Sequence, residues 1–235
     1  MLNTKTQKFC AWSGLVGVLL FFSAFGFARF IPPPGPWLTQ EQVVAMYMDN
    51  TSGIRTGMVL MMISSMFISP FVAVISQHLR RMEGVNRLMT YTQLSSGSVG
   101  ILFFNIPAVL FLITAFRPDR SPELTYLMND ASWIVTVMVW PPAFMQNLSI
   151  GVAILQDKSA KPIFPRWLGF FQFWVCLLFI PGSFVPFFKS GPFAWNGLLS
   201  FWVAGTAFTL WFVVMLTMLL KAINREAEEA ATLAG

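Results

Sequence analysis

Few side chains in this sequence can carry nucleophilic, redox or metal chemistry. The 235 residues include one histidine, His78, and two cysteines, Cys10 and Cys176, which fall in different apolar stretches. A single imidazole and two separated thiols do not make a zinc site, a bis-histidine haem site or a redox pair. We therefore predict that the chain binds no metal ion and no other cofactor.

Four further residues could support acid–base chemistry near one edge of the membrane. Arg29 follows the first apolar stretch, whereas Glu123, Tyr126 and Asp130 precede the fourth. Together they form a candidate outer mouth for a membrane enzyme that acts on a lipid-soluble substrate. No Asp, Glu or Lys lies in the middle of an apolar stretch, which argues against proton pumping and favours a protein without enzymatic activity.

Uncharged polar side chains inside the apolar stretches are stronger candidates for a binding site. An amide in hydrocarbon needs a partner, so each one marks either a contact between helices or the wall of a polar cavity. Their helical spacing predicts a cavity among the second to fifth membrane helices. The candidate lining residues are Ser65, Ser69, Ser98, Asn105, Trp140, Gln146, Asn147 and Gln172.

Two helix faces carry much of this polar character. Tyr91, Ser95, Ser98 and Asn105 recur along one stripe of the third apolar stretch, so we expect that stripe to face protein or water and not lipid. A second face in the fourth stretch combines Thr136, Trp140, Ala143 and Asn147.

The elements that must position these side chains are membrane helices. Hydrophobic residues make up 56% of the chain and charged residues 11%, against about 25% charged residues in a soluble domain. Six stretches without Asp, Glu, Lys or Arg reach the roughly 20 residues that span a bilayer. We predict an all-α polytopic membrane protein, a single domain over 1–235 built as a bundle of six transmembrane helices. The expected spans are 9–31, 54–79, 88–116, 131–156, 165–188 and 193–221, with a short outer helix at 39–48.

Short sequence signals refine these helices. Thr39 and Gln42 have capping-box spacing, so the short outer helix is expected to begin there and either lie on the membrane surface or cap the bundle. A proline inside a helix removes a backbone hydrogen bond to the residue four positions earlier, which predicts kinks in the second to fifth helices. The prolines concerned are Pro70, Pro107, Pro141, Pro142 and Pro181.

Lysine and arginine set the expected orientation. Ten of the 15 basic residues fall on the side of the termini and five on the other side. The positive-inside rule therefore places both termini in the cytoplasm. The net charge of +5 follows from this topology, so the expected partners are membrane lipids, and no nucleic acid is expected.

Several stretches at helix ends and turns look familiar. They are 53–58 (GIRTGM), 91–97 (YTQLSSG), 115–120 (AFRPDR), 164–169 (FPRWLG) and 191–197 (GPFAWNG). Together they resemble a group of bacterial six-helix membrane proteins of about this length, and the resemblance covers most of the chain. It implies a bacterial cytoplasmic (inner) membrane, and it carries over no catalytic or binding residues because no activity is assigned to that group.

Three functions remain open from the sequence. The first is a membrane protein that binds or moves a small apolar, lipophilic molecule in a cavity among the second to fifth helices. The second is an accessory or structural subunit of a membrane complex or a homo-oligomer, which needs no site at all. The third is the enzyme with the outer mouth described above.

Overall fold

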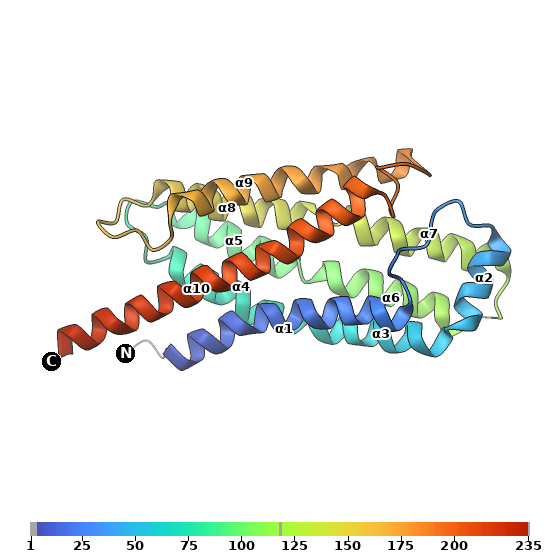
Figure 1. Ribbon diagram of the computed structural model, residues 1–235, viewed down its shortest axis with the longest axis horizontal. Helices are drawn as coiled ribbons and strands as arrows, with labels where there is room; N and C mark the ends of the chain where they lie inside the picture. Colours follow the sequence, from blue (N-terminus) through green and yellow to red (C-terminus); the bar gives the residue numbers. More distant parts are fainter. Residues whose placement is uncertain (1–3, 118, 235) are drawn as a thin grey trace.

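The computed structural model describes residues 4–117 and 119–234, and these residues form helices without any β-strand. The bundle is elongated, and both termini lie at the same end of its long axis (Figure 1). In chain order the elements are α1 (Thr4–Ala28), α2 (Gln40–Asp49), α3 (Thr51–Ser65), α4 (Ile68–Leu79), α5 (Arg87–Val99), α6 (Leu102–Phe116), α7 (Pro122–Met138), α8 (Pro141–Gln156), α9 (Arg166–Phe179), the 3₁₀ helix η1 (Ile180–Phe187), the π-helix η2 (Leu198–Val203) and α10 (Ala204–Ala234).

Within the described residues, six helical segments are long and apolar enough to cross a membrane, as the sequence predicted. The fourth segment begins at Pro122 and not at 131, because Pro122 is a favourable first helical residue and backbone hydrogen bonding continues through polar helix ends. The segments are Thr4–Ala28, Thr51–Leu79, Arg87–Phe116, Pro122–Gln156, Arg166–Phe187 and Leu198–Thr232.

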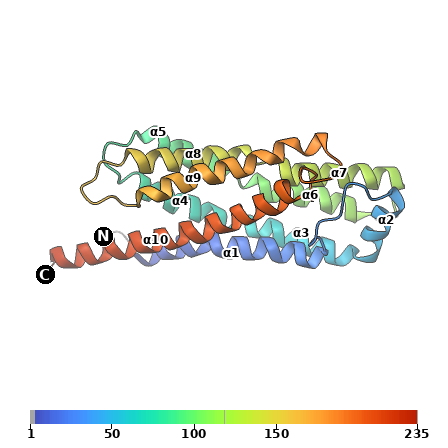
Figure 2. The ribbon, with the colours of Figure 1, turned by 45° about the horizontal axis from the view of Figure 1, so that its top comes forward.

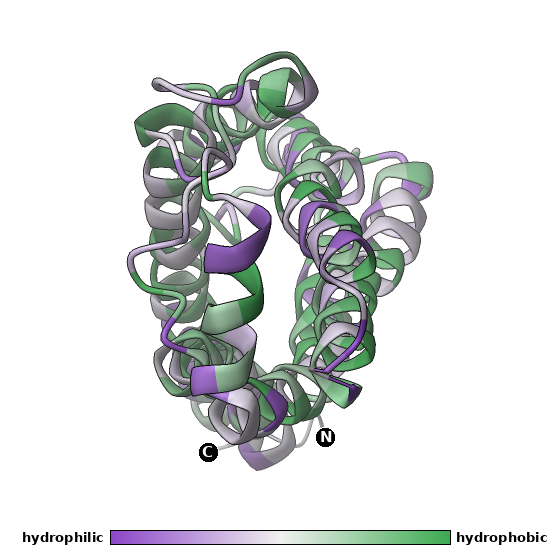
Figure 3. Cartoon of the chain, turned by 90° about the vertical axis from the view of Figure 1, so that its right-hand side faces the viewer, coloured by the Kyte–Doolittle hydropathy of each residue, from purple (hydrophilic) through white to green (hydrophobic). Residues whose placement is uncertain are grey.

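The six segments form a closed ring in chain order. Each segment packs against the one before it and the one after it, and α1 packs against α10 to close the ring. Figure 2 shows α1 and α10 running side by side, and Figure 3 looks along the long axis of the ring. Each helix therefore presents one face to the centre of the ring and another to the surroundings.

Small residues bring α1 and α3 into backbone contact. A Cβ at Gly57 would lie 2.3 Å from the carbonyl oxygen of Ala24, and one at Gly53 would lie 2.5 Å from that of Phe27. The two glycines are four residues apart, which is the spacing of close small-residue contacts between membrane helices. The Asn50 side chain adds a hydrogen bond of 3.0 Å to the Phe27 carbonyl oxygen. These contacts fix the position of α1 in the ring.

Four of the spans are interrupted along their length. The breaks lie at 66–67 between α3 and α4, at 100–101 between α5 and α6, and at 139–140 between α7 and α8. In the fifth span, α9 tightens into η1 at Ile180. Residues at two of these breaks, Gly100, Val139 and Trp140, lie at the centre of the ring.

The prolines relate to these breaks in different ways. Pro107 lies inside α6, several residues beyond the break at 100–101, so that break is not at the proline. Pro181 cannot donate to the carbonyl oxygen of Leu177, four positions earlier, but the N–H of Ile180 donates to this oxygen at the end of α9. The local tightening into a 3₁₀ helix thus satisfies the carbonyl group without help from another element.

The short helix α2 covers the end of the bundle that lies away from the termini (Figure 1). Its capping box is formed as predicted: the Thr39 hydroxyl accepts from the Gln42 N–H at 3.4 Å, and the Thr39 N–H donates to the Gln42 side chain at 2.9 Å. Its buried face, with Val43 and Tyr47, packs against α7. The sequence allowed this helix to lie on the membrane surface or to cap the bundle, and α2 caps the bundle.

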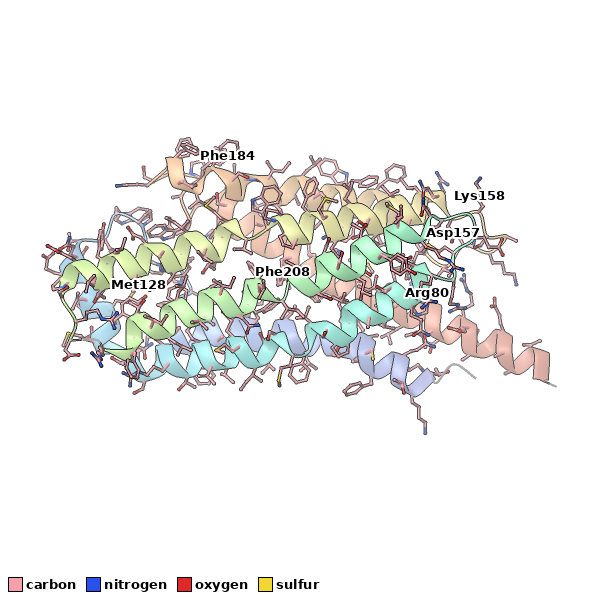
Figure 4. The ribbon with its side chains drawn as sticks, turned by 180° about the vertical axis from the view of Figure 1, so that it is seen from behind. Arg80, Met128, Asp157, Lys158, Phe184 and Phe208 are labelled. Atoms are coloured by element: carbon pink, nitrogen blue, oxygen red, sulfur yellow. The ribbon has the colours of Figure 1, made fainter. Side chains whose placement is uncertain are left out.

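Polar contacts join the loops at the end that carries the termini. Arg81 forms an ion pair with Glu226 of α10. The backbone N–H of Lys158 donates to the Glu83 carbonyl oxygen at 2.9 Å, which links the loop after α8 to the loop after α4. Figure 4 shows Arg80 and Lys158 together at this end of the molecule.

Candidate ligand-binding cavity

The centre of the ring contains a cavity of about 130 Å³, and all six membrane segments contribute to its lining. Phe208 of α10 is one of the lining residues and lies near the middle of the long axis (Figure 4). The sequence placed the cavity among the second to fifth helices, but the first and sixth line it extensively and the second contributes only Ile68. The first and sixth helices were not predicted to line the cavity because an apolar wall leaves no polar signal in the sequence.

Aromatic rings make up much of the cavity wall. Phe21 of α1 packs against Phe104 of α6 with ring centroids 5.1 Å apart, and against Phe103 at 5.7 Å. Phe208 and Phe212 of α10 continue the wall, with their centroids 5.0 Å apart. Such pairs contribute about 0.5–1.5 kcal/mol each beyond the burial of their area, so this wall is held firmly in place.

The opposite wall comes from α7 and α8. Pro141 and Pro142 occupy the first turn of α8, where proline is tolerated because the first N–H groups of a helix have no partner within it. All four members of the predicted shared face line this cavity, together with the neighbouring Gln146. These four are Thr136, Trp140, Ala143 and Asn147.

Two amide groups on this wall have unused hydrogen-bonding atoms. Gln146 and Asn147 are 7% and 2% exposed, and no described residue forms a hydrogen bond with the Gln146 Nε2 or the Asn147 Oδ1. The other half of the Asn147 amide is occupied, because its Nδ2 donates to the Ala143 carbonyl oxygen at 2.8 Å. Buried polar atoms are nearly always paired, so these two atoms are the chemically distinctive feature of the cavity.

The π-helix η2 forms one end of the cavity. Ser200 lies in η2, and its hydroxyl is within hydrogen-bond distance of the carbonyl oxygens of Pro181 at 3.2 Å and Phe193 at 3.1 Å. Gly182 lets η1 approach α7 closely, since a Cβ there would lie 2.9 Å from the Val137 carbonyl oxygen. Single turns of π-helix occur frequently at functional sites, and this one lies at the cavity.

Gln172 was predicted to line the cavity but supports it from behind. The Trp211 Nε1 donates to its Oε1 at 2.7 Å, and its Nε2 lies 3.3 Å from the Met215 sulfur. Trp211 itself lines the cavity, whereas Gln172 does not. The amide is therefore a positioning group that fixes the Trp211 ring.

The structure places the remaining four predicted lining residues outside the cavity. The Ser65 hydroxyl of α3 lies 2.7 Å from the Met62 carbonyl oxygen of its own helix and 3.3 Å from the Asn105 Oδ1 of α6, so Ser65 and Asn105 form a contact between two helices. Ser69 and Ser98 are exposed on the outside of the ring, and the Ser98 hydroxyl donates to the Leu94 carbonyl oxygen at 2.8 Å. A hydroxyl that bonds its own helix needs no other partner, so the α5 part of the predicted stripe is exposed on the outside of the ring, whereas Asn105 contacts α3.

The four residues of the predicted outer mouth do not line the cavity either. Arg29 and Glu123 are exposed, whereas Tyr126 and Asp130 are half-buried. Arg29 has a φ of 57° at the end of α1, where the next N–H donates to the Phe25 carbonyl oxygen at 2.9 Å. This hydrogen bond is part of a Schellman motif, so Arg29 holds a position that usually belongs to glycine.

A buried polar pair near α2 was not foreseen. The Tyr47 hydroxyl lies 3.4 Å from the Asn129 Oδ1, to which it donates. Both residues are buried, and burial raises the pKa of the Tyr47 phenol above its usual value. The sequence predicted this short helix but carried no signal that its tyrosine would meet a polar residue on α7.

Known proteins do not indicate a family for this chain, so its class is assigned from the fold and the cavity. No protein-family model, curated protein or solved structure matches the chain. Among residues 4–117 and 119–234, no group of three or more His, Cys, Asp or Glu side chains could hold a metal ion. The class defined by the fold and the site is a six-helix membrane protein with a central, largely aromatic cavity.

Proposed function

We propose that this membrane protein binds a small, largely apolar molecule in its central cavity. The observation that supports the proposal is a space of about 130 Å³ inside a ring of six membrane segments, with largely apolar walls to which many aromatic side chains contribute. Protein interiors hold few voids larger than a water molecule, because empty space sacrifices contacts. Binding sites for small molecules combine such apolar walls with a few well-placed polar groups, as this cavity does.

The volume limits the size of the occupant. A cavity of about 150 Å³ lined by apolar side chains holds one benzene molecule, and the present cavity is of similar size. The enclosed part of the ligand is therefore comparable to a single six-membered ring with a small substituent. A longer molecule would have only one end in the cavity.

The interrupted spans favour movement of this molecule as well as binding. Gly100, Val139 and Trp140 lie at two of the breaks, and all three line the cavity. Broken helices beside a site near the middle of the membrane are typical of transporters, because local changes at a break can open a path. Binding is the step that can be tested first.

Replacement of Gly205 tests the proposed binding. Gly205 lines the cavity, and a Cβ there would meet no heavy atom within 4 Å, so Gly205→Phe places a ring in open space. Gly26 on α1 is equally unobstructed but does not line the cavity, so Gly26→Phe is the matched control.

The readout is binding of anisole and benzyl alcohol by equilibrium dialysis against protein-free micelles of the same detergent. We expect the Gly205→Phe variant to lose at least tenfold in affinity for both probes, and the Gly26→Phe variant to bind both as the unaltered protein does. Equal binding by the two variants would refute the cavity as the site.

A second function is favoured by the outward polar stripe on α5. Tyr91, Ser95 and Ser98 are exposed on the outside of the ring, where a helix of another subunit or of a second copy would cover them. If the protein is such a subunit, replacing Ser95 and Ser98 together by leucine should reduce the size of the assembly purified from native membranes. An unchanged monomeric size before and after the replacement argues against this function.

We further propose that the protein lies in a bacterial inner membrane with both termini in the cytoplasm. The end that carries the termini also carries Arg80, Arg81 and Lys158, in line with the positive-inside rule. A reporter that is active only in the cytoplasm should be active when fused after the last residue and inactive when fused within the α6–α7 loop. The reverse pattern would overturn this orientation.

A further inference from the structure

The amide of Asn147 is held in one orientation by its own helix. Its Nδ2 donates to the Ala143 carbonyl oxygen at 2.8 Å, and a carbonyl oxygen can only accept. The nitrogen of the amide must therefore point to Ala143, and the Oδ1 is left as an acceptor to which no residue in 4–117 or 119–234 donates. The side chain is 2% exposed and belongs to the cavity lining, so the missing donor is expected to come from a molecule inside the cavity.

Gln146 supplies a second unpaired group beside it. Its Nε2 has no partner in the part of the chain that the structure describes, and its amide packs against α5, where a Cβ at Gly97 would lie 2.8 Å from that nitrogen. Unlike Asn147, Gln146 has no hydrogen bond that fixes which end of its amide is the donor. It can therefore donate to an oxygen or accept from a hydroxyl, depending on what occupies the cavity.

We infer that the ligand is an apolar molecule that carries a hydrogen-bond donor, namely a hydroxyl group that donates to the Asn147 Oδ1 and can accept from the Gln146 Nε2. This inference rests on the proposed binding function and narrows its ligand class to alcohols and phenols, or to the hydroxyl end of a longer lipid. A ketone, an ester or an ether has no donor, so it leaves the Asn147 oxygen unpaired, which is unfavourable for a buried polar atom.

Two isomeric probes test the donor requirement. Benzyl alcohol and anisole both have the formula C7H8O and one ring, but only benzyl alcohol can donate a hydrogen bond. One well-formed hydrogen bond corresponds to about a tenfold change in affinity. We therefore expect the unaltered protein, in detergent micelles, to bind benzyl alcohol about tenfold more tightly than anisole after subtraction of the amount taken up by protein-free micelles.

Replacement of Asn147 assigns this preference to one atom. Asn147→Leu removes the acceptor at similar side-chain size, so this variant should bind the two isomers equally while still binding anisole. The matched control is Asn105→Leu, which makes the same chemical change at an amide that lies outside the cavity. This control should keep the tenfold preference for the alcohol.

The possible outcomes separate this inference from the function on which it rests. Equal binding of both isomers by the unaltered protein, as expected if only water pairs with Asn147, overturns the donor requirement but leaves the cavity as a binding site. A tenfold preference that survives Asn147→Leu also overturns the assignment. Failure of the unaltered protein to bind either isomer above the micelle background contradicts the proposed function itself. The isomer comparison needs no variant, so it remains decisive even if Asn147→Leu does not fold.

Discussion

Gly57 offers a quantitative test of how the ring is held together. A Cβ at this position would lie 2.3 Å from the Ala24 carbonyl oxygen, whereas a carbon and a carbonyl oxygen in favourable contact are about 3.3–3.6 Å apart. Gly57→Ala therefore requires α1 and α3 to separate by about 1 Å. The obstacle is a backbone atom, so no side-chain rotation can relieve it.

The expected effect can be divided into two opposing contributions. Overpacking of a well-packed contact destabilises a protein by about 1–3 kcal/mol, and a backbone obstacle favours the upper end of that range. Replacing a helical glycine by alanine raises the free energy of unfolding by about 0.5–1 kcal/mol. Gly57→Ala should therefore lower the free energy of unfolding by about 2 kcal/mol.

Gly26→Ala is the matched control on α1, because a Cβ there meets no heavy atom within 4 Å. This variant should show only the stabilising contribution, an increase of about 0.5–1 kcal/mol in the free energy of unfolding. The assay is reversible unfolding by SDS in mixed micelles, followed by tryptophan fluorescence. If the free energies of unfolding of Gly57→Ala and Gly26→Ala differ by less than about 1 kcal/mol, the close α1–α3 contact does not hold the ring in the way we describe.

Two further predictions concern the end of the bundle near α2. Arg29→Gly should be about 1 kcal/mol more stable than Arg29→Ala in the same unfolding assay, because only glycine adopts the observed φ of 57° without strain; equal stability would rule out strain at this residue. The raised pKa of Tyr47 means that the folded state keeps its phenol protonated at a pH where the unfolded state loses the proton. The free energy of unfolding should therefore be retained below about pH 10 and fall as the pH rises further. In the Tyr47→Phe variant it should fall less steeply over the same range. An identical alkaline decline in this variant would contradict that reasoning.

The distribution of charge was sufficient to predict the membrane segments. Charge-free stretches place helices reliably, because a charged group in hydrocarbon is strongly unfavourable and helices alone satisfy the backbone there. Helix ends were less well defined: α7 begins at Pro122, ahead of Glu123 and Asp130, because a helix can extend beyond the apolar part of its span.

The cavity was only partly predictable because polarity identified one of its walls. Trp140, Gln146 and Asn147 were expected in the lining and are found there. Ser98 was expected there too, but its hydroxyl bonds to its own helix, an option that spacing in a sequence does not distinguish from a contact across a cavity.

The other wall of the cavity could be identified only from the tertiary structure. Phe21 and Phe208 carry no feature that separates a cavity-lining phenylalanine from one that faces lipid, because both environments are apolar. The same is true of the breaks in the helices, since the break at 100–101 lies away from Pro107. Only the folded ring shows which apolar side chains surround the central space.

Photolabelling tests the central claim, that the cavity binds a small hydroxylated apolar molecule, most directly. The probe is a diazirine derivative of benzyl alcohol, and the labelled residues on α10 are identified by mass spectrometry of peptides. Phe208 and Trp211 line the cavity, whereas Leu210 and Val213 on the same helix are 51% and 43% exposed on the outside of the ring. We predict labelling of Phe208 and Trp211 that excess benzyl alcohol suppresses, whereas labelling confined to Leu210 and Val213 and unaffected by benzyl alcohol would contradict the claim.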